Sequence, residues 1–220
     1  MNPRSPVTLL GLATVAAMAL SSPATAHPHV FVDAQVDIVF DGQGRMKEIR
    51  QVWQFDQAFS VFATQGLDAN ADGKLDAGEL KPLAEINVTS LKDFDFFSFL
   101  TIGDQKVALL PPEKYWLEFE GGRLTLFYTL PVNEPVAVGP RTVLEVFDRE
   151  YFVEFGFAAD QPIRLESAPA GCSTSHHRPQ ELDAQIMSVL SVIPPDQRNL
   201  PPDIAAAVSK LANYAAVTCG

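Results

Sequence analysis

Two neighbouring runs, KYWLEF (residues 114–119) and RLTLFYTL (residues 123–130), decide the fold. Both are rich in aromatic and other apolar residues that favour strands, and the glycines between them are typical of a turn. Similar runs follow at TVLEVFD (residues 142–148) and YFVEFGF (residues 151–157). Several short strands at this spacing predict an antiparallel sheet or a β-sandwich.

The strand pattern extends toward the N-terminus. Apolar and polar residues largely alternate over residues 30–40, which is strand periodicity, and the sequence DGQG at residues 41–44 is typical of a turn. A second strand is predicted over residues 46–55. The two strands are therefore expected to form a hairpin.

Helical patterns interrupt the strands once. Residues 56–67 predict a helix with Asp56 as its candidate N-cap. Residues 78–86 predict a second helix, although Pro82 lacks the N–H group that a helix interior uses. The segment between these helices carries the calcium-like motif described below.

The composition changes near the C-terminus. SAPAGCSTSHHRP, residues 167–179, is typical of a linker because it is rich in small residues and proline. Helical patterns follow over residues 181–192 and 202–217.

These patterns together predict an α+β fold with an antiparallel β-rich core. We expect a β-rich domain over residues 27–167, with an EF-hand-like helix-loop-helix insertion at residues 56–86. Residues 168–220 are expected to form a linker and a small C-terminal helical region.

Residues 1–26 have the layout of a signal peptide. Arg4 precedes an apolar run over residues 7–20, which is shorter than the roughly 20 residues that cross a bilayer. The small residues 24–26 fit the A-x-A cleavage rule. We expect cleavage after Ala26 and a periplasmic protein without stable membrane insertion; a retained anchor is the alternative.

The chain is acidic, with 16 Lys and Arg against 27 Asp and Glu and a formal net charge of −11. Such a surface argues against nucleic acid as a partner and is compatible with cations. Cys172 and Cys219 predict one disulfide, because an even cysteine count in an exported chain favours a bridge. Ligation of a metal by the thiolates is the alternative.

Residues 68–79, DANADGKLDAGE, match the EF-hand template D-x-[DN]-x-[DN]-G-x5-E in full. Gly73 allows the sharp turn that this loop needs. The match predicts a calcium site with a structural role, although a solvated acidic loop is the simpler alternative. The expected oxygen ligands are Asp68, Asn70, Asp72, the carbonyl of Lys74, Asp76 and Glu79.

All four histidines occur as two close pairs, His27 with His29 and His176 with His177. Imidazole binds zinc, nickel, cobalt or copper. Cleavage after Ala26 would add the α-amino group of His27 as another nitrogen ligand. Pro28 disfavours a copper site built on successive backbone amides, because proline has no N–H. We expect the second pair to complete the site, unless the histidines are only solvated surface residues.

Two carboxylates, Asp33 and Asp148, are candidate metal ligands or partners of the imidazoles, and capping of turns is the equal alternative. Two aromatic clusters, residues 53–59 and 147–155, most simply belong to the core. A binding groove is the alternative for both clusters.

Three stretches, HPHVFVDA (residues 27–34), WQFDQAFS (residues 53–60) and FDREYFVEF (residues 147–155), resemble the DUF1007 family. The resemblance extends from His27 to the C-terminal cysteine. It implies a bacterial periplasmic component of ABC-type transport systems that are linked to zinc, nickel or cobalt uptake. His27 and His29 match the family's histidine motif.

The leading hypothesis is a periplasmic protein that binds a transition metal, with a structural calcium ion. It would serve an inner-membrane metal transporter as an accessory or chaperone. We expect no enzyme activity, because the sequence has no serine-histidine-acid pattern, no G-x-S-x-G motif and no phosphate loop. The alternatives are a copper protein or enzyme with an N-terminal histidine brace, and a calcium-stabilised interaction module without a transition metal.

Overall fold

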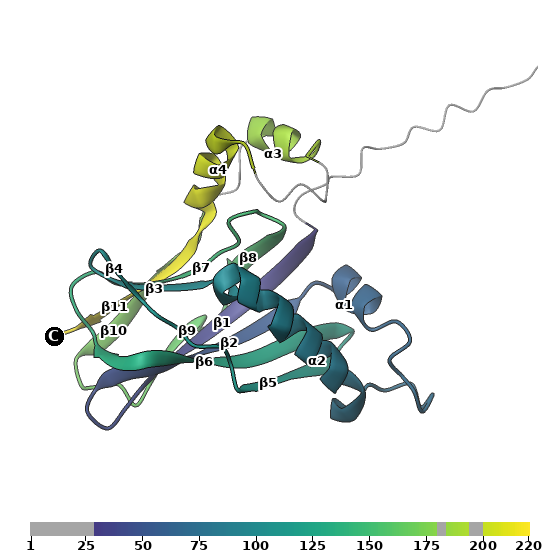
Figure 1. Cartoon of the computed structure of the whole chain (residues 1–220), viewed down its shortest axis with the longest axis horizontal. Coiled ribbons are helices and arrows are strands. Elements are labelled where there is room, and N and C mark those ends of the chain that lie inside the picture. Colours follow the sequence, from purple (N-terminus) through teal and green to yellow (C-terminus); the bar gives the residue numbers. More distant parts are fainter. Residues whose placement is uncertain (1–28, 180–183, 194–199) are drawn as a thin grey trace, which may run out of the picture.

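Two β-sheets packed against each other form the body of the protein (Figure 1). The structure is a computed structural model that describes residues 29–179, 184–193 and 200–220. Residues 1–26, for which a signal peptide is predicted, lie outside the described residues. Among the residues described, no helix has both the length and the apolar character needed to cross a membrane.

The first sheet has the strand order β5-β6-β2-β1-β8, and β9 also pairs with β1. Its strands are β1 (Val30–Phe40), β2 (Arg45–Phe55), β5 (Lys114–Glu120), β6 (Arg123–Ala137), β8 (Val153–Phe157) and β9 (Ile163–Glu166). The predicted hairpin is confirmed, because β1 and β2 pair antiparallel. The expected antiparallel β-rich core is confirmed, with the exception that β8 and β9 run parallel to β1.

The second sheet has the strand order β10-β11-β7-β3-β4. Its strands are β3 (Ser98–Ile102), β4 (Gln105–Val107), β7 (Thr142–Val146), β10 (Cys172–His177) and β11 (Asn213–Cys219). The expected linker contains β10. The helix expected over residues 202–217 is present only over its first part, Pro202–Val208. Its second part is strand β11, because Ala215 and Val217 are buried between the sheets.

The described residues form few helices. They are α1 (Gln57–Ala63), α2 (Ala77–Leu91), α3 (Ala184–Leu190), α4 (Pro202–Val208) and the 3₁₀ segments η1 (Lys92–Phe97) and η2 (Ser209–Leu211). Asp56 is the N-cap of α1, as predicted, because its side chain accepts the Phe59 N–H. Helix α2 is longer than predicted despite Pro82. It buries one stripe against the core: Leu80, Ala84 and Val88.

Trp53 lies at the centre of the main core, with Tyr128 and Phe155 packed edge-on against its ring. Gln51 links the sheets, because its Nε2 donates to Ser98 Oγ at 2.9 Å while its Oε1 accepts the Trp53 Nε1–H at 3.1 Å. Burial raises the pKa of Tyr128 well above its usual value. Its hydroxyl therefore remains a donor in this apolar setting.

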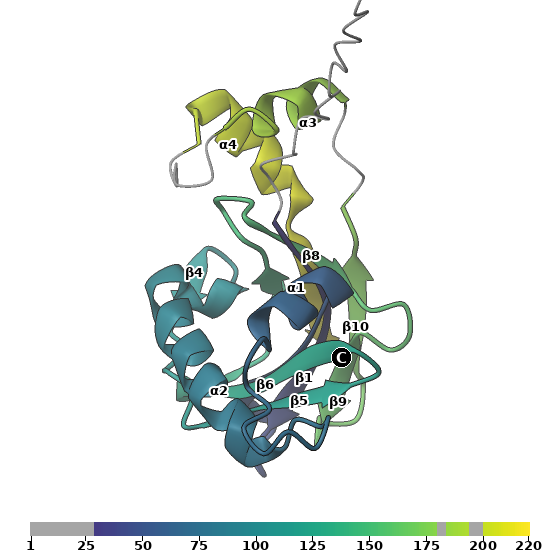
Figure 2. The ribbon, with the colours of Figure 1, turned by 90° about the vertical axis from the view of Figure 1, so that its right-hand side faces the viewer.

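Helices α3 and α4 lie together at one end of the molecule (Figure 2). They pack on the segment that follows β7, where Phe147 and Tyr151 join Leu190, Ile204 and Val208 in a second, smaller core. The aromatic cluster at residues 147–155 is thus divided between the two cores, and the interpretation as core is confirmed for its buried members, Phe147, Tyr151 and Phe155.

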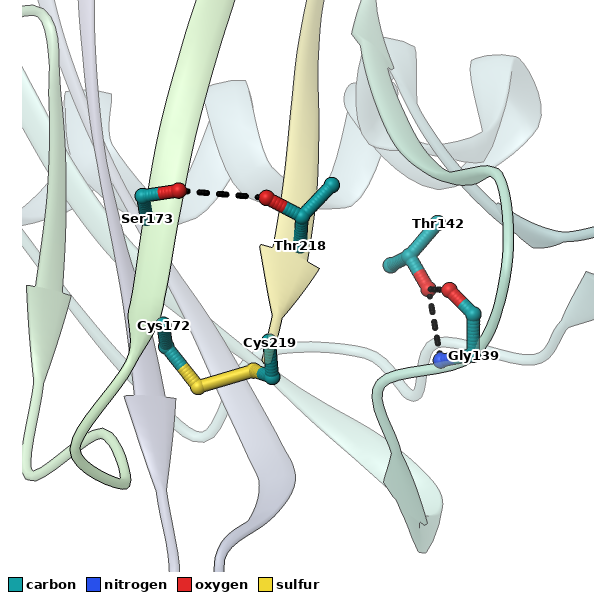
Figure 3. The surroundings of a disulfide bond; sticks show 6 residues. All are labelled: Gly139, Thr142, Cys172, Ser173, Thr218 and Cys219. Atoms are coloured by element: carbon teal, nitrogen blue, oxygen red, sulfur yellow. Dashed lines mark hydrogen bonds between the residues drawn. A yellow bond between two sulfur atoms is a disulfide. The ribbon is translucent and has the colours of Figure 1, made fainter.

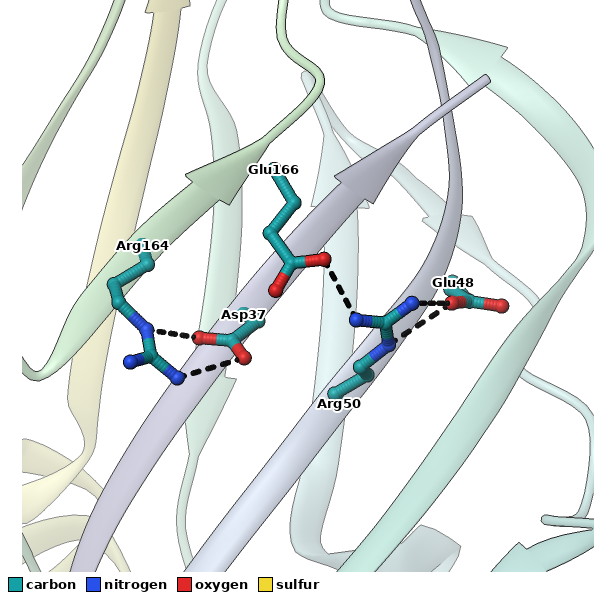
Figure 4. Close-up of polar contacts among 5 residues, drawn as sticks. All are labelled: Asp37, Glu48, Arg50, Arg164 and Glu166. Carbon is teal, nitrogen blue, oxygen red and sulfur yellow. Dashed lines mark hydrogen bonds and ion pairs between the residues drawn. The ribbon is translucent and has the colours of Figure 1, made fainter.

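Ion pairs fasten β9 onto β1 (Figure 4). Arg164 donates to both carboxylate oxygens of Asp37, at 2.6 and 2.9 Å, and the two residues are directly opposite in the register of β1 and β9. Arg50 of β2 contacts Glu48 and Glu166, each at 2.6 Å. Asp37 raises the pKa of Arg164 by hydrogen bonding and by its charge.

Candidate functional site

The calcium-like loop connects α1 to α2, and its side chains fold back onto its own backbone. Asp68 accepts the N–H groups of Asp72 and Gly73, at 3.1 and 2.9 Å. Asn70 Oδ1 accepts the Asp72 N–H at 2.8 Å, and Asp72 Oδ1 accepts the Lys74 N–H at 2.8 Å. Three predicted ligands therefore turn toward the loop backbone.

The last predicted ligand reaches back to the start of the loop. Glu79 Oε1 accepts the N–H of Ala69 at 2.9 Å and that of Asn70 at 3.4 Å, and its Oε2 accepts the Asp76 N–H at 3.1 Å. Asp76 Oδ1 in turn accepts the N–H groups of Gly78 and Glu79, which completes a capping box at the start of α2. The ends of the loop are thus held side by side.

The described part of the chain contains no group of three or more His, Cys, Asp or Glu side chains placed to hold a metal ion. The loop carboxylates face N–H groups of the backbone instead. Helix α1 also ends at Ala63, whereas the loop begins at Asp68, so the two do not join directly as a helix and loop do in an EF-hand.

His29 lies at the head of β1, and His27 falls outside the described residues. The backbone N–H of His29 donates to the Phe152 carbonyl at 2.9 Å, and its exposed ring lies 4.8 Å from the Phe152 ring between centroids. This contact holds the first described residue against the segment that precedes β8.

His176 and His177 occupy adjacent positions of β10, so their side chains point to opposite faces of the second sheet. His176 approaches Phe157 edge-on at 6.0 Å, whereas His177 stacks on Tyr214 at 4.9 Å, both between ring centroids. Neither histidine is grouped with His29 in a metal site among the described residues.

The two candidate carboxylates have other partners. Asp33 Oδ2 receives a hydrogen bond from Arg123 at 2.9 Å. Asp148, only 2% exposed, accepts the N–H groups of Glu150, Phe152 and Val153, each at 2.9 Å. Asp148 therefore caps the turn that follows it, which is one of the two roles predicted for it.

The disulfide between Cys172 and Cys219 is present (Figure 3). The two cysteines are opposite each other in the register of β10 and β11, at one end of the strand pair. Ser173 and Thr218, one position further along, place their hydroxyl oxygens 3.1 Å apart. The bridge therefore ties the C-terminal strand to the edge strand of the second sheet.

A pocket of about 390 Å³ that was not predicted from the sequence lies beside β3 and β4. Arg149 contributes to it, with its guanidinium carbon 4.2 Å from the centroid of the Phe99 ring. Glu145, the cross-strand neighbour of Phe99, also lines it. Sequence alone gave no signal, because the pairing of β3 with β7 is what brings these side chains together.

The family model described as "Protein of unknown function (DUF1007)" matches residues 12–219. The chain belongs to the DUF1007 family. The expected family is therefore confirmed over nearly the whole length of the chain.

Among curated proteins, an uncharacterized 15.5 kDa protein in the trpE 3′ region of Spirochaeta aurantia is similar to this DUF1007 chain. The two are 25% identical over 104 residues, which is 47% of this chain and 74% of the other protein.

Proposed function

We propose that this DUF1007 protein is a periplasmic metal-binding protein whose loop at residues 68–79 binds a structural calcium ion. The observation that supports the calcium site most directly is the hydrogen bond that Glu79 Oε1 accepts from the Ala69 N–H at 2.9 Å. It brings the carboxylate at loop position twelve beside the residues at positions one to three. In an EF-hand loop that carboxylate must reach the same place to bind calcium bidentately.

The chemistry of the loop suits a hard cation. Side chains supply oxygens at positions one, three, five, nine and twelve, and position seven offers a carbonyl. Four of these residues are acidic and only Lys74 is basic, so the carboxylates repel each other. A divalent cation would relieve this repulsion and stabilise the folded protein by mass action.

The segment from α1 to α2 is EF-hand-like in this proposal. It differs from an EF-hand in the four residues between α1 and the loop, and it stands as a single unit. Both differences favour a weak affinity for calcium, with a dissociation constant in the range of about 10⁻⁴–10⁻³ M that extracellular calcium modules show.

The second part of the proposal is a transition-metal role, which rests on the sequence. His27 and His29, with the α-amino group freed by cleavage after Ala26, would bind zinc, nickel or cobalt. The protein would then serve an inner-membrane metal transporter as an accessory or chaperone. His176 and His177 lie on opposite faces of β10, so at most one of them could join such a site.

Calcium titration of the purified protein tests the first part. We expect calcium to raise the melting temperature of the wild type, and Glu79→Gln to abolish this increase. Glu85→Gln is the matched control, because Glu85 is an exposed acid on the same helix outside the loop. An equal calcium-induced increase in the Glu79→Gln variant would refute the calcium site.

Zinc titration of the protein with a correctly processed N-terminus tests the second part. The double variant His27→Ala, His29→Ala should lose zinc binding and keep calcium binding. The double variant His176→Ala, His177→Ala is the control and should retain most of the zinc affinity. Unchanged zinc affinity after loss of His27 and His29 would contradict the transition-metal role.

A further inference from the structure

The pocket beside β3 and β4 contains charges of both signs. Arg149 and Lys106 contribute cations, and Asp95 and Glu145 contribute carboxylates. Within the described chain, none of these four side chains takes part in an ion pair. Elsewhere in the described chain, Arg45, Arg50, Arg123, Arg141 and Arg164 each pair with a carboxylate.

Arg149 and Glu145 flank the same aromatic ring. The guanidinium carbon of Arg149 lies 4.2 Å from the Phe99 centroid, and Glu145 is the residue directly opposite Phe99 on β7. Side chains of directly opposite residues are near neighbours on one face of a sheet. The cation–π contact orients the guanidinium and leaves its N–H groups available to an anion.

The backbone around the pocket is fixed from two sides. Asp148, the residue before Arg149, is buried, and its carboxylate accepts three N–H groups of the following turn. Asp95 and Phe96 also line the pocket, and their φ angles of 52° and 53° lie in the left-handed region, as does the 47° of Phe97. The Phe147 N–H joins the two sides by donating to the Phe97 carbonyl at 3.1 Å.

Left-handed backbone at bulky residues is unfavourable, so it persists only where surrounding contacts maintain it. Buried contacts maintain it here, because Tyr128 OH and Ser98 Oγ both donate to the Phe96 carbonyl, at 3.1 and 2.9 Å. Strain of this kind is concentrated at binding sites, where it preorganises the wall of the site.

A ligand that fits this pocket needs a negative group, a positive group and an apolar part. A polyanion would meet two carboxylates, and a cation would meet Arg149 and Lys106. An α-amino acid carries one carboxylate and one ammonium group on the same carbon atom, and an apolar side chain would cover Val107 and Leu109. The volume of about 390 Å³ is at the lower end of the range of about 300–1,000 Å³ for small-molecule sites.

We propose that this pocket binds a free amino acid with an apolar side chain. Arg149 binds its carboxylate, Glu145 binds its ammonium group, and Phe99 forms the surface beneath them. The inference goes beyond the proposed metal function, because no residue of the loop at 68–79 lines the pocket.

Isothermal titration of the full protein with L-leucine tests the proposal. We expect saturable binding at one site, weakened at least tenfold in Arg149→Gln. Arg141→Gln is the matched control, because Arg141 is an exposed arginine at the other end of β7 and does not line the pocket. Unchanged affinity in Arg149→Gln, or no binding of leucine, valine, methionine or phenylalanine by the wild type, would overturn the proposal.

Two analogues separate the roles of the charges. Leucine amide lacks the carboxylate and N-acetyl-leucine lacks the ammonium group, so each should bind at least tenfold more weakly than leucine. Glu145→Gln should weaken leucine binding without changing the affinity for N-acetyl-leucine. If N-acetyl-leucine bound as tightly as leucine, the pocket would be a simple anion site and the proposal would be wrong. Glu79→Gln should leave leucine binding intact, which separates this test from that of the calcium site.

Discussion

Asn213, the first residue of β11, accepts the backbone N–H of Phe157 on β8 with its side-chain carbonyl oxygen at 3.3 Å. Its side-chain NH₂ group donates to the Phe155 carbonyl. Strand β8 is an edge strand of the first sheet, and β11 belongs to the second. The fully buried side-chain amide of Asn213, on the second sheet, therefore satisfies two backbone groups at the edge of the first sheet.

We predict that Asn213→Ala lowers the free energy of unfolding by about 1–3 kcal/mol, because it leaves a buried N–H and a buried carbonyl without their partner. Urea denaturation at neutral pH measures the change. Asn87→Ala is the control. The Asn87 side chain also donates to a carbonyl, that of Leu83, but from the partly exposed surface of α2. The control should shift stability by less than about 0.5 kcal/mol, and equal losses in both variants would contradict the bridging role.

The role of Asn213 illustrates what the sequence could not predict. The alternation over residues 30–40 identified β1 with its correct bounds, because burial on one face over residues 30–36 leaves a period of two in the sequence. The C-terminal ANYAAVTC has no such signal, since alanine fits a helix as well as a buried position between sheets. Pairing with β7 and β10 selects the strand, and pairing of this kind is a property of the whole fold.

The candidate sites also differ in whether they could be predicted: a site within one short segment could be, and a site that depends on strand geometry or on the tertiary structure could not. The loop at residues 68–79 is local, so its template could be recognised from sequence spacing. The N-cap of α2 at Asp76 was not predicted. His176 and His177 are adjacent in sequence, yet a strand sends their side chains to opposite faces. The pocket at Arg149 depends on left-handed residues in an Asp-Phe-Phe segment, a conformation that the aromatic residues themselves disfavour.

The disulfide should contribute strongly to stability. We predict that Cys172→Ser together with Cys219→Ser lowers the free energy of unfolding by about 3–4 kcal/mol, the chain-entropy value for a closed loop of this length. The sequence separation of the two cysteines is 47 residues. Urea denaturation with and without a reductant measures the effect. Reduction should destabilise the wild type by a similar amount and leave the double variant unchanged.

Ser173→Ala provides the control for the disulfide, because it removes an exposed hydroxyl contact with Thr218 next to the bridge. This variant should change stability by less than about 0.5 kcal/mol. If the double serine variant were no less stable than Ser173→Ala, the bridge would contribute nothing measurable to the folded state.

Asp37 provides the last prediction, because its side chain is 9% exposed while that of its partner Arg164 is 51% exposed. We expect Asp37→Asn to lower the free energy of unfolding by about 1–2 kcal/mol, a value reduced for solvent screening at the guanidinium. The loss follows because Arg164 and the neighbouring Arg50 would keep their charges beside an uncharged amide.

Asp104→Asn is the control for this prediction. It removes the exposed pair with Arg141, at 3.2 Å, and should lower the free energy of unfolding by less than about 0.5 kcal/mol. Urea denaturation in low and high salt separates the two cases, since the exposed pair is screened more strongly. Equal losses for Asp37→Asn and Asp104→Asn would show that burial does not strengthen the link between β1 and β9.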